Sequence, residues 1–309
     1  LALVFTITLV VSQMTRKYTA MDKIIFRPET IFLMIIFGIG VITPLLVLKI
    51  GFWGCGVILS IAIVSFCVFS LIPFLKGVNG VLKYDIGIGN LNEAILEAIE
   101  LGYEPRAINK IGELNEISES AVREYREDVI LYISRVQSRI AIKSAEKKLW
   151  DLTLLVIYVL KNIGVNSVEK ELYNSTRGIV DGLRSIAGST LADVKDAVTV
   201  EVLRGLSDIG VKAAEKKYMG EIISDVANNL TDFGRRWSKN EALIGLGCLG
   251  AAATKYMSRF IVDIVIRDIT ELEETISEDW LPLAERRCIE QYPDLKEAFE
   301  KFKRRYNKG

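Results

Sequence analysis

Hydrophobic and polar residues are segregated along this chain into an apolar first quarter and a charged remainder. Residues 31–48 and residues 52–75 contain no charged side chain, and only "KIG" separates the two runs. Each run is close to the roughly 20 apolar residues that cross a hydrocarbon layer. Because backbone in lipid must satisfy its own hydrogen bonds, the pattern predicts an antiparallel hairpin of two membrane-spanning helices.

A shorter apolar run, "LALVFTITLVVSQM", opens the chain, and basic residues follow it. A secretory signal peptide carries its basic residues before the apolar core, so this order argues against one. Residues 1–14 are also too few to cross a bilayer. We expect them to be the cytoplasmic end of a membrane helix that begins before Leu1.

The basic residues predict the orientation of these spans. Residues 1–76 contain six Lys or Arg and two Asp or Glu, whereas the rest of the chain has 33 basic and 37 acidic residues. Four of the six cations lie in residues 15–29, and the hairpin tip carries Lys49 alone. Because cation-rich loops stay in the cytoplasm, we expect a multi-pass cell-membrane protein with a cytoplasmic C-terminal domain. The predicted division is a transmembrane domain, 1–76, a linker, 77–90, and a helical domain, 91–309.

The membrane part resembles a known family on three stretches. These are "VFTITLVVSQM", "RPETIFLMIIFGIGVITPLLVL" and "GVILSIAIVSFCVFSLIPFLKGV". They are similar to the membrane core of the predicted integral-membrane proteins called domain of unknown function 2254, over roughly residues 1–80. The resemblance implies a helix with alternating hydroxyl residues, a basic loop and a two-span hairpin, and it implies no activity.

Hydroxyl side chains form a stripe on the opening helix. Thr8, Ser12 and Thr15 follow one another at steps of four and three residues, which places them on one helix face. Polar residues in a membrane helix turn away from lipid, towards another helix or a water-filled path. These three residues, with Thr43 beside the kinking Pro44, are therefore candidates for facing a pore, and packing between helices is the alternative.

Small side chains on the last span indicate close helix contact. Gly56, Ser60 and Cys67 fall four and seven residues apart, as in seams where membrane helices approach closely. The full spans contain no ionisable Asp, Glu, Lys or Arg, which argues against a proton-coupled pump or a voltage sensor.

The remainder of the chain is predicted to be α-helical almost throughout. Asn90 and Glu93 resemble a capping box, and residues 117–145 form one long amphipathic stretch with apolar positions at helical spacing. The predicted fold class is all-α: the membrane helices, a partial span and a hairpin, precede a cytoplasmic helical bundle or a HEAT-like array of helical hairpins.

A weak repeat favours the array. The pattern leucine, two residues, an apolar residue and a small residue recurs from Leu160, Leu183, Leu206 and Leu230, at steps of 23, 23 and 24 residues. One step is the length of a helix with its turn, and two steps are the length of a paired-helix repeat. The small residue, which is glycine in three of the four copies, is expected to end its helix in the left-handed conformation.

The run "GLGCLG" has the glycine spacing of a dinucleotide-binding loop at Gly245, Gly247 and Gly250. That motif requires a strand before it and an acidic residue on the next strand, for which Asp268 is the candidate. A chain that is otherwise helical supplies no sheet. Close packing of helices is therefore the favoured interpretation of these glycines.

Composition restricts the chemistry further. The chain has no histidine, and its four cysteines show no CxxC spacing. A histidine-based triad and a histidine-ligated zinc site are excluded, and the cysteines are interpreted as small apolar side chains. We expect no enzymatic activity, no cofactor, no metal and no nucleic-acid partner.

Two functional hypotheses follow. The first is a homo-oligomeric ion channel or conduit, embedded in the bilayer, whose cytoplasmic helices assemble and gate it. The alternative is a membrane-anchored helical-repeat scaffold that binds protein partners on the extended surface of its array.

Overall fold

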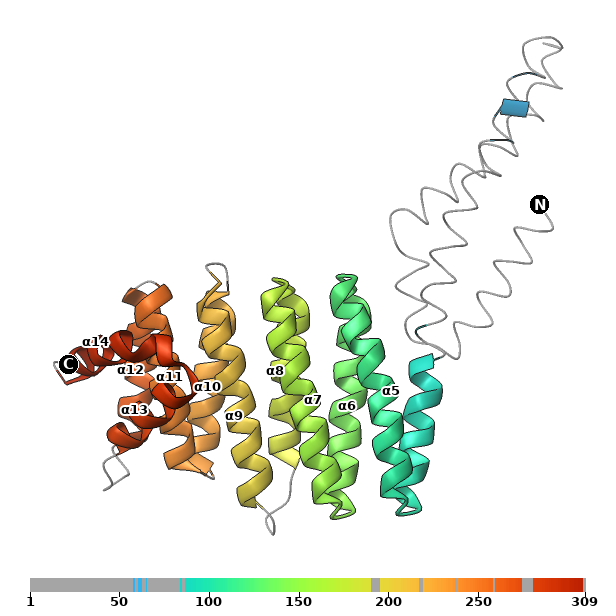
Figure 1. Cartoon of the computed structure of the whole chain (residues 1–309), viewed down its shortest axis with the longest axis horizontal. Coiled ribbons are helices and arrows are strands. Elements are labelled where there is room, and N and C mark those ends of the chain that lie inside the picture. Colours follow the sequence, from blue (N-terminus) through green and yellow to red (C-terminus); the bar gives the residue numbers. More distant parts are fainter. Residues whose placement is uncertain are drawn as a thin grey trace. The chain divides into compact units, whose positions relative to one another are not determined.

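A computed structural model (Figure 1) describes residue 84 and residues 87–189, 195–216, 219–236, 238–257, 259–273 and 280–307, with four separate residues, 58, 61, 62 and 65. The chain divides into two compact units, Leu1–Gly89 and Asn90–Gly309. All the long helices described below belong to the second unit, which we call the array. Among the described residues there is no β-strand, so the all-α prediction is confirmed for this part of the chain.

A helix over residues 87–100 leads into the array and overlaps the predicted linker at residues 87–90. The helices that follow are α5 (Glu104–Arg123), α6 (Glu127–Glu146), α7 (Trp150–Glu169), α8 (Tyr173–Ser189), α9 (Lys195–Ala214), α10 (Gly220–Arg236), α11 (Lys239–Tyr256), α12 (Arg259–Glu273), α13 (Trp280–Gln291) and α14 (Lys296–Tyr306), with the 3₁₀ turn η1 (Pro293–Leu295) before α14.

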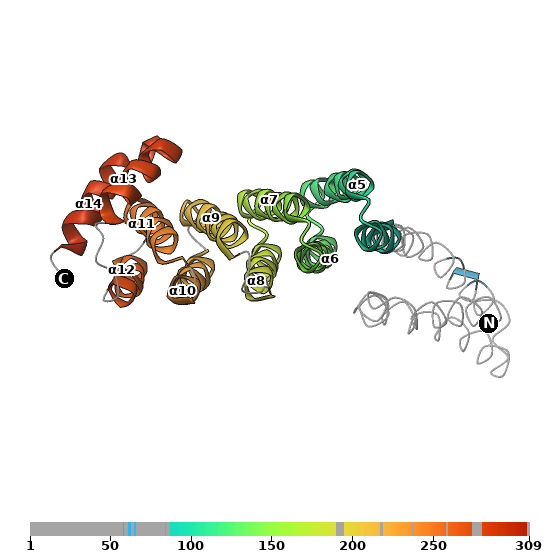
Figure 2. The ribbon, with the colours of Figure 1, turned by 90° about the horizontal axis from the view of Figure 1, so that it is seen from below.

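The helices alternate between two rows (Figure 2). Helices α5, α7, α9 and α11 form one row, and α6, α8, α10 and α12 form the other. From α5 to α11 each helix contacts the next helix and the one after it. Polar contacts within the second row join residues 48 positions apart, as between Arg177 and Asp225, 3.4 Å, and between the Tyr173 hydroxyl and Glu221, 2.5 Å. The repeating unit is therefore a pair of helices, and the predicted helical repeat is confirmed.

The turns of the first repeats share one backbone geometry. A residue with positive φ occurs every 23 positions, at Gly102, Tyr125, Lys148 and Glu171, with φ between 56° and 71°. The amide after each one donates to a carbonyl five residues back, for example Leu149 to Ser144 at 2.9 Å. This is the Schellman arrangement that satisfies the last carbonyls of a helix.

These turns correct two predictions. The predicted single amphipathic stretch over residues 117–145 is wrong, because the positive-φ residue Tyr125 separates α5 from α6. The repeat glycines also do not end helices, since Gly164 and Gly210 lie inside α7 and α9. Three of the four left-handed positions are occupied by Tyr, Lys or Glu, so glycine content did not mark where the helices end.

The repeat leucines form the core between the rows. Leu160, Leu183, Leu206 and Leu230 lie on four successive helices, and all are fully buried. The small residue four positions later allows the helices to approach closely. A Cβ added to Gly164 would lie 2.5 Å from the Ile209 Cδ1 atom, which is closer than real Cβ contacts allow.

The last helices cover the end of the α11 row. Phe299 and Phe302 of α14 are fully buried against α11, where a Cβ on Gly250 would lie 2.4 Å from the Phe302 ring. The basic end of the chain is partly paired within the array, because Lys303 contacts Glu285 at 2.9 Å and Arg305 contacts Asp263 at 2.5 Å. These helices therefore act as a polar cap of the kind that terminates repeat arrays.

Helix α7 has the length and apolar composition of a membrane span, the one helix among the described residues that does. More than half of that apolar window, 56%, is buried inside the array. A core helix of a helical array passes the same test, and the contacts of α7 with α5, α6, α8 and α9 place it among the core helices.

One residue breaks the leucine pattern of the core. Counting back 23 residues from Leu160 reaches Gln137 on α6, which is 0% exposed and has no hydrogen-bond partner for either amide atom among the described residues. A buried polar group without a partner costs about 1–3 kcal/mol of stability. We therefore expect Gln137→Leu to stabilise the folded protein by about that amount, measured as a rise in the thermal unfolding midpoint of the purified chain.

The matched control is Leu160→Gln, which places the same amide at the equivalent position of α7. It should destabilise the protein by roughly 2–5 kcal/mol, because apolar burial is lost and a polar group is buried. If Gln137→Leu instead lowers the midpoint, the Gln137 amide has a partner in the folded protein.

Candidate functional site

The residues proposed from sequence to face a pore, Thr8, Ser12, Thr15 and Thr43, lie outside the described residues. The same is true of the predicted packing seam, Gly56, Ser60 and Cys67. These assignments therefore stay predictions, and the candidate site among the described residues is a network of polar contacts in the array.

The glycine-rich run is confirmed as a helix-packing element. Gly245, Gly247 and Gly250 all lie inside α11. A Cβ on Gly247 would lie 3.0 Å from Ala284 and 3.2 Å from the Trp280 ring. Asp268, which would have to follow a second strand, lies on helix α12. The strand, loop and helix that a dinucleotide site requires are not present in this segment.

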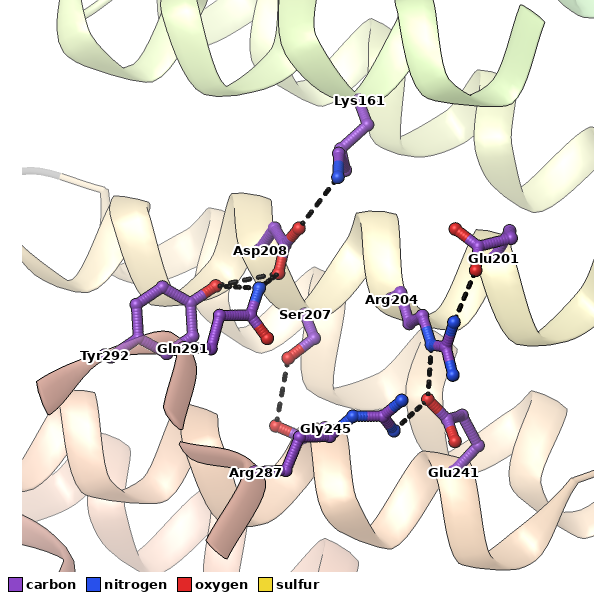
Figure 3. A network of polar contacts seen from close by, with 10 residues as sticks. All are labelled: Lys161, Glu201, Arg204, Ser207, Asp208, Glu241, Gly245, Arg287, Gln291 and Tyr292. Carbon is purple, nitrogen blue, oxygen red and sulfur yellow. Dashed lines mark hydrogen bonds and ion pairs between the residues drawn. The ribbon is translucent and has the colours of Figure 1, made fainter. Parts of the chain in front are cut away.

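Asp208 is the centre of the polar network that joins the first row to the tail (Figure 3). One of its carboxylate oxygens accepts hydrogen bonds from the Gln291 amide, 2.6 Å, and from the Tyr292 hydroxyl, 2.7 Å. The other oxygen lies 3.2 Å from the Lys161 ammonium. The side chain of Asp208 is 15% exposed, so these contacts are shielded from much of the solvent. Helices α7, α9 and α13 thus meet at one carboxylate.

A second carboxylate lies beside the first. Glu241 of α11 accepts from Arg204 of α9, 3.0 Å, and is paired with Arg287 of α13. Arg204 also donates to Glu201 at 2.6 Å. Two guanidinium groups on one carboxylate that is 14% exposed form a charge-assisted contact stronger than a neutral hydrogen bond. Glu241 therefore repeats, between α9, α11 and α13, the role that Asp208 has between α7, α9 and α13.

The surroundings of Tyr292 favour a phenol that donates a hydrogen bond over one that takes up or releases a proton. Burial, and then the negative charge of Asp208, raise the pKa of the Tyr292 phenol above its usual value. The phenol therefore stays protonated and donates to Asp208. A general base requires the opposite shift, towards neutral pH.

Two cysteines lie next to this network. Cys248 of α11 and Cys288 of α13 are free and buried. Contact with Cys288, and then burial, raise the pKa of the Cys248 thiol well above its usual value. Because the thiolate is the nucleophilic form, this shift disfavours reactivity at neutral pH. Within the described ranges no group of three His, Cys, Asp or Glu side chains could hold a metal ion.

The repeat sequence contains the signal for part of this network. Lys161 is the residue after the repeat leucine of α7, and Asp208 is the second residue after that of α9. The same two positions in the other row, Arg184 of α8 and Asp232 of α10, are paired at 3.9 Å. A basic residue in one helix and an acidic residue two helices later therefore mark contacts between repeats. The contributions of Gln291, Tyr292 and Arg287 have no such periodicity.

Comparisons with known proteins assign no family and no function to this chain. No family model matches the chain, and no curated protein matches it. One solved structure with some similarity is a "circular tandem repeat protein with novel repeat topology and enhanced subunit contact surfaces". The two share 12% identity and a TM-score of 0.31, over 97% of this chain and 87% of that one. Similarity this low gives no support for a shared fold. The assignment of a helical repeat therefore rests on the residue spacing and the contacts within this chain.

The network predicts a local effect of Asp208→Asn. The change keeps the side-chain size but removes the charge that Lys161, Gln291 and Tyr292 contact, at a cost of about 1–3 kcal/mol. Amide hydrogen exchange in α13 should become faster by roughly 5- to 100-fold, because that cost lowers the free energy of local opening.

Asp181→Asn is the matched control, since Asp181 is exposed on α8 in the other row. It should leave the exchange of α13 unchanged. Equal exchange in both variants would show that Asp208 does not hold α13 to the array.

Proposed function

We propose that this protein is a membrane-anchored helical-repeat scaffold, whose array binds a protein partner on the cytoplasmic side of the membrane. The observation that carries the proposal is the stacked arrangement of paired helices, which exposes two long rows of side chains over residues 104–273. Repeat arrays of this kind present extended surfaces for binding other proteins. The polar network around Asp208 and Glu241 supports the same view, because its groups contact one another and hold α13 against the array.

The anchoring part of the proposal rests on residues 1–76. Two uncharged runs of spanning length and the surrounding basic loops support it. Ile58 and Ile61, which fall in the second run, are helical and exposed, and lipid is the solvent that accepts such side chains at low cost. The cytoplasmic position of the array follows from the same distribution of charge.

The outer side of α7 is the best candidate for the partner surface. Tyr158 is 56% exposed there, and the Lys161 ammonium lies 5.2 Å from the centre of its ring. Leu154 and Leu155, one turn before it, are only partly buried. Exposed tyrosine beside aliphatic side chains is typical of the residues that dominate protein interfaces.

A photo-crosslinking amino acid at Tyr158, introduced into the full-length protein in cells, tests the scaffold. We expect a covalent adduct of defined mass, because the side chain would contact the partner. The matched position is Arg286 of α13, whose side chain is 79% exposed. It should give no such adduct. Absence of an adduct from Tyr158 would contradict the proposed partner surface.

An ion conduit is the second candidate, favoured by the hydroxyl stripe Thr8, Ser12 and Thr15 and by the uncharged spans. In this version several copies associate and their spans enclose the path. Ion flux through liposomes containing the full-length protein tests it. If the stripe lines a path, Thr8→Ala with Ser12→Ala should change the flux several-fold, since one lost hydrogen-bonding group is worth about 1 kcal/mol. Protein that inserts but conducts nothing would contradict this candidate.

A further inference from the structure

The turns that follow α5, α7, α9 and α11 lie along one edge of the array (Figure 1). Contacts between successive turns establish this. The Lys170 ammonium lies 5.6 Å from the centre of the Tyr125 ring, and Lys216 contacts Glu171 at 3.3 Å. A Cβ on Gly220 would in turn lie 3.6 Å from Ile261. We call this the aromatic edge, defined by Tyr125, Tyr256 and Phe260 with the cations Lys170, Lys255 and Arg259.

Two aromatic side chains on this edge expose more than half of their surface to solvent, and exposing an apolar ring to water is unfavourable. Phe260 is 69% exposed and Tyr125 is 58% exposed. Two of the three rings have a cation against them: Lys170 lies 5.6 Å from the Tyr125 ring centre, and Lys255, which with the Tyr256 hydroxyl also donates to Asp294, lies 4.7 Å from the Tyr256 ring centre. Arg259 is next to Phe260 in the sequence. Aromatic side chains next to long cationic ones are typical of the headgroup layer of a membrane, where rings and ammonium groups each find their preferred surroundings.

Acidic side chains on the same edge limit the role of net charge. Glu124, Glu171 and Glu215 lie in the same turns as the cations. An edge with nearly balanced charge gains little from anionic lipid specifically. The attraction to a bilayer would therefore come from the rings, and it would extend to a zwitterionic surface.

The path of the chain brings a bilayer to this edge. Glu100, at the end of the first helix, contacts Lys143 and Lys147 at the opposite edge. The start of the array at Asn90 therefore points towards the aromatic edge. Fourteen residues separate Leu75, the end of the second uncharged run, from Asn90. At about 3.3–3.6 Å per residue they reach at most about 50 Å, which is long enough for the edge at which the array begins to touch the membrane surface.

We propose that the aromatic edge lies in the headgroup layer of the bilayer in which the protein is anchored. The inference rests on the proposed membrane anchoring and adds a second contact with the lipid. Because the bilayer is held near the edge by the same chain, even a weak contact is populated. The array then stands with its helices pointing away from the membrane surface, and the outer sides of both rows stay accessible to partners.

The opposite edge supplies a matched control. Tyr103 is 59% exposed in the turn before α5, so its exposure resembles that of Tyr125. Helix α5 has 20 residues, and at 1.5 Å per residue it separates the two edges by about 30 Å. The two edges therefore carry an equally exposed aromatic side chain. Under the proposal they differ in their distance from the bilayer.

The test uses the full chain in phosphatidylcholine nanodiscs, with a nitroxide on the lipid headgroup as the quencher. A fluorophore is attached at F260C or, as the control, at Y103C, and unsubstituted protein measures labelling of the native cysteines. We expect quenching at position 260 to exceed that at position 103 by at least about twofold, because the two edges are about 30 Å apart. R259C gives an independent probe of the same edge.

Equal quenching at positions 260 and 103, or quenching at neither, would overturn the proposal. Shielding of position 260 from a soluble quencher without quenching by the lipid nitroxide would also overturn it, since a protein partner would then cover the edge. Failure of the proposed anchoring is a separate result: the protein would not be incorporated into the nanodiscs. If the protein is incorporated into the nanodiscs but positions 260 and 259 are not quenched, only the contact between the aromatic edge and the lipid headgroups is rejected.

Discussion

The array depends on one packing constraint: side chains of neighbouring helices fill the space left by one small residue per helix. At Gly164 and Gly210 the side chain of a neighbouring helix occupies the space where a Cβ would stand: an added Cβ would lie 2.5 Å from Ile209 and 2.9 Å from Val226. A larger residue would push the helices apart and open the core around the repeat leucines. The distance between α7 and α9 within their row, and between α9 and α10 across the rows, follows from this fit.

Ion pairs between repeats mainly align each helix with the equivalent helix of the next repeat. Arg184 and Asp232, both well exposed, lie 3.9 Å apart, and pairs of this kind contribute at most about 1 kcal/mol. Lys161 and Asp208 have the same relation in the other row, but Asp208 is more buried and also contacts the tail. The same repeat position thus has two roles. In one row it aligns adjacent repeats, and in the other it also holds α13 against the array.

Stability in a stacked array is a sum of local terms, so a weak position affects its neighbours most. Helix α6 contains such a position, because Gln137 replaces a repeat leucine and its buried amide has no partner in the part of the chain that the structure describes. Ser134 and Ser138 on the same helix face Gly178 and Gly182 of α8. The core is therefore more polar at α6 than at α7, where the buried Leu160 and Ile157 occupy the positions of Gln137 and Ser134. Opening of the array is expected to begin there.

The sequence by itself determined the all-α class of the array and its 23-residue period, because a repeated leucine four residues before a small side chain is a local pattern. It also indicated, through the absence of a sheet, that Gly245, Gly247 and Gly250 pack helices. The helix ends were not predictable in the same way. Tyr125 and Lys148 adopt positive φ although their residue types disfavour it, since the helices on both sides impose the turn.

Only the tertiary structure decided which side chains meet across the repeats. Tyr292 and Gln291 reach Asp208 from more than 80 residues away, and no local pattern encodes that distance. The same holds for the aromatic edge, whose members belong to different turns and become neighbours only when the helices stack. Local sequence specifies helices and their buried faces, whereas contacts between distant residues depend on how those faces pack.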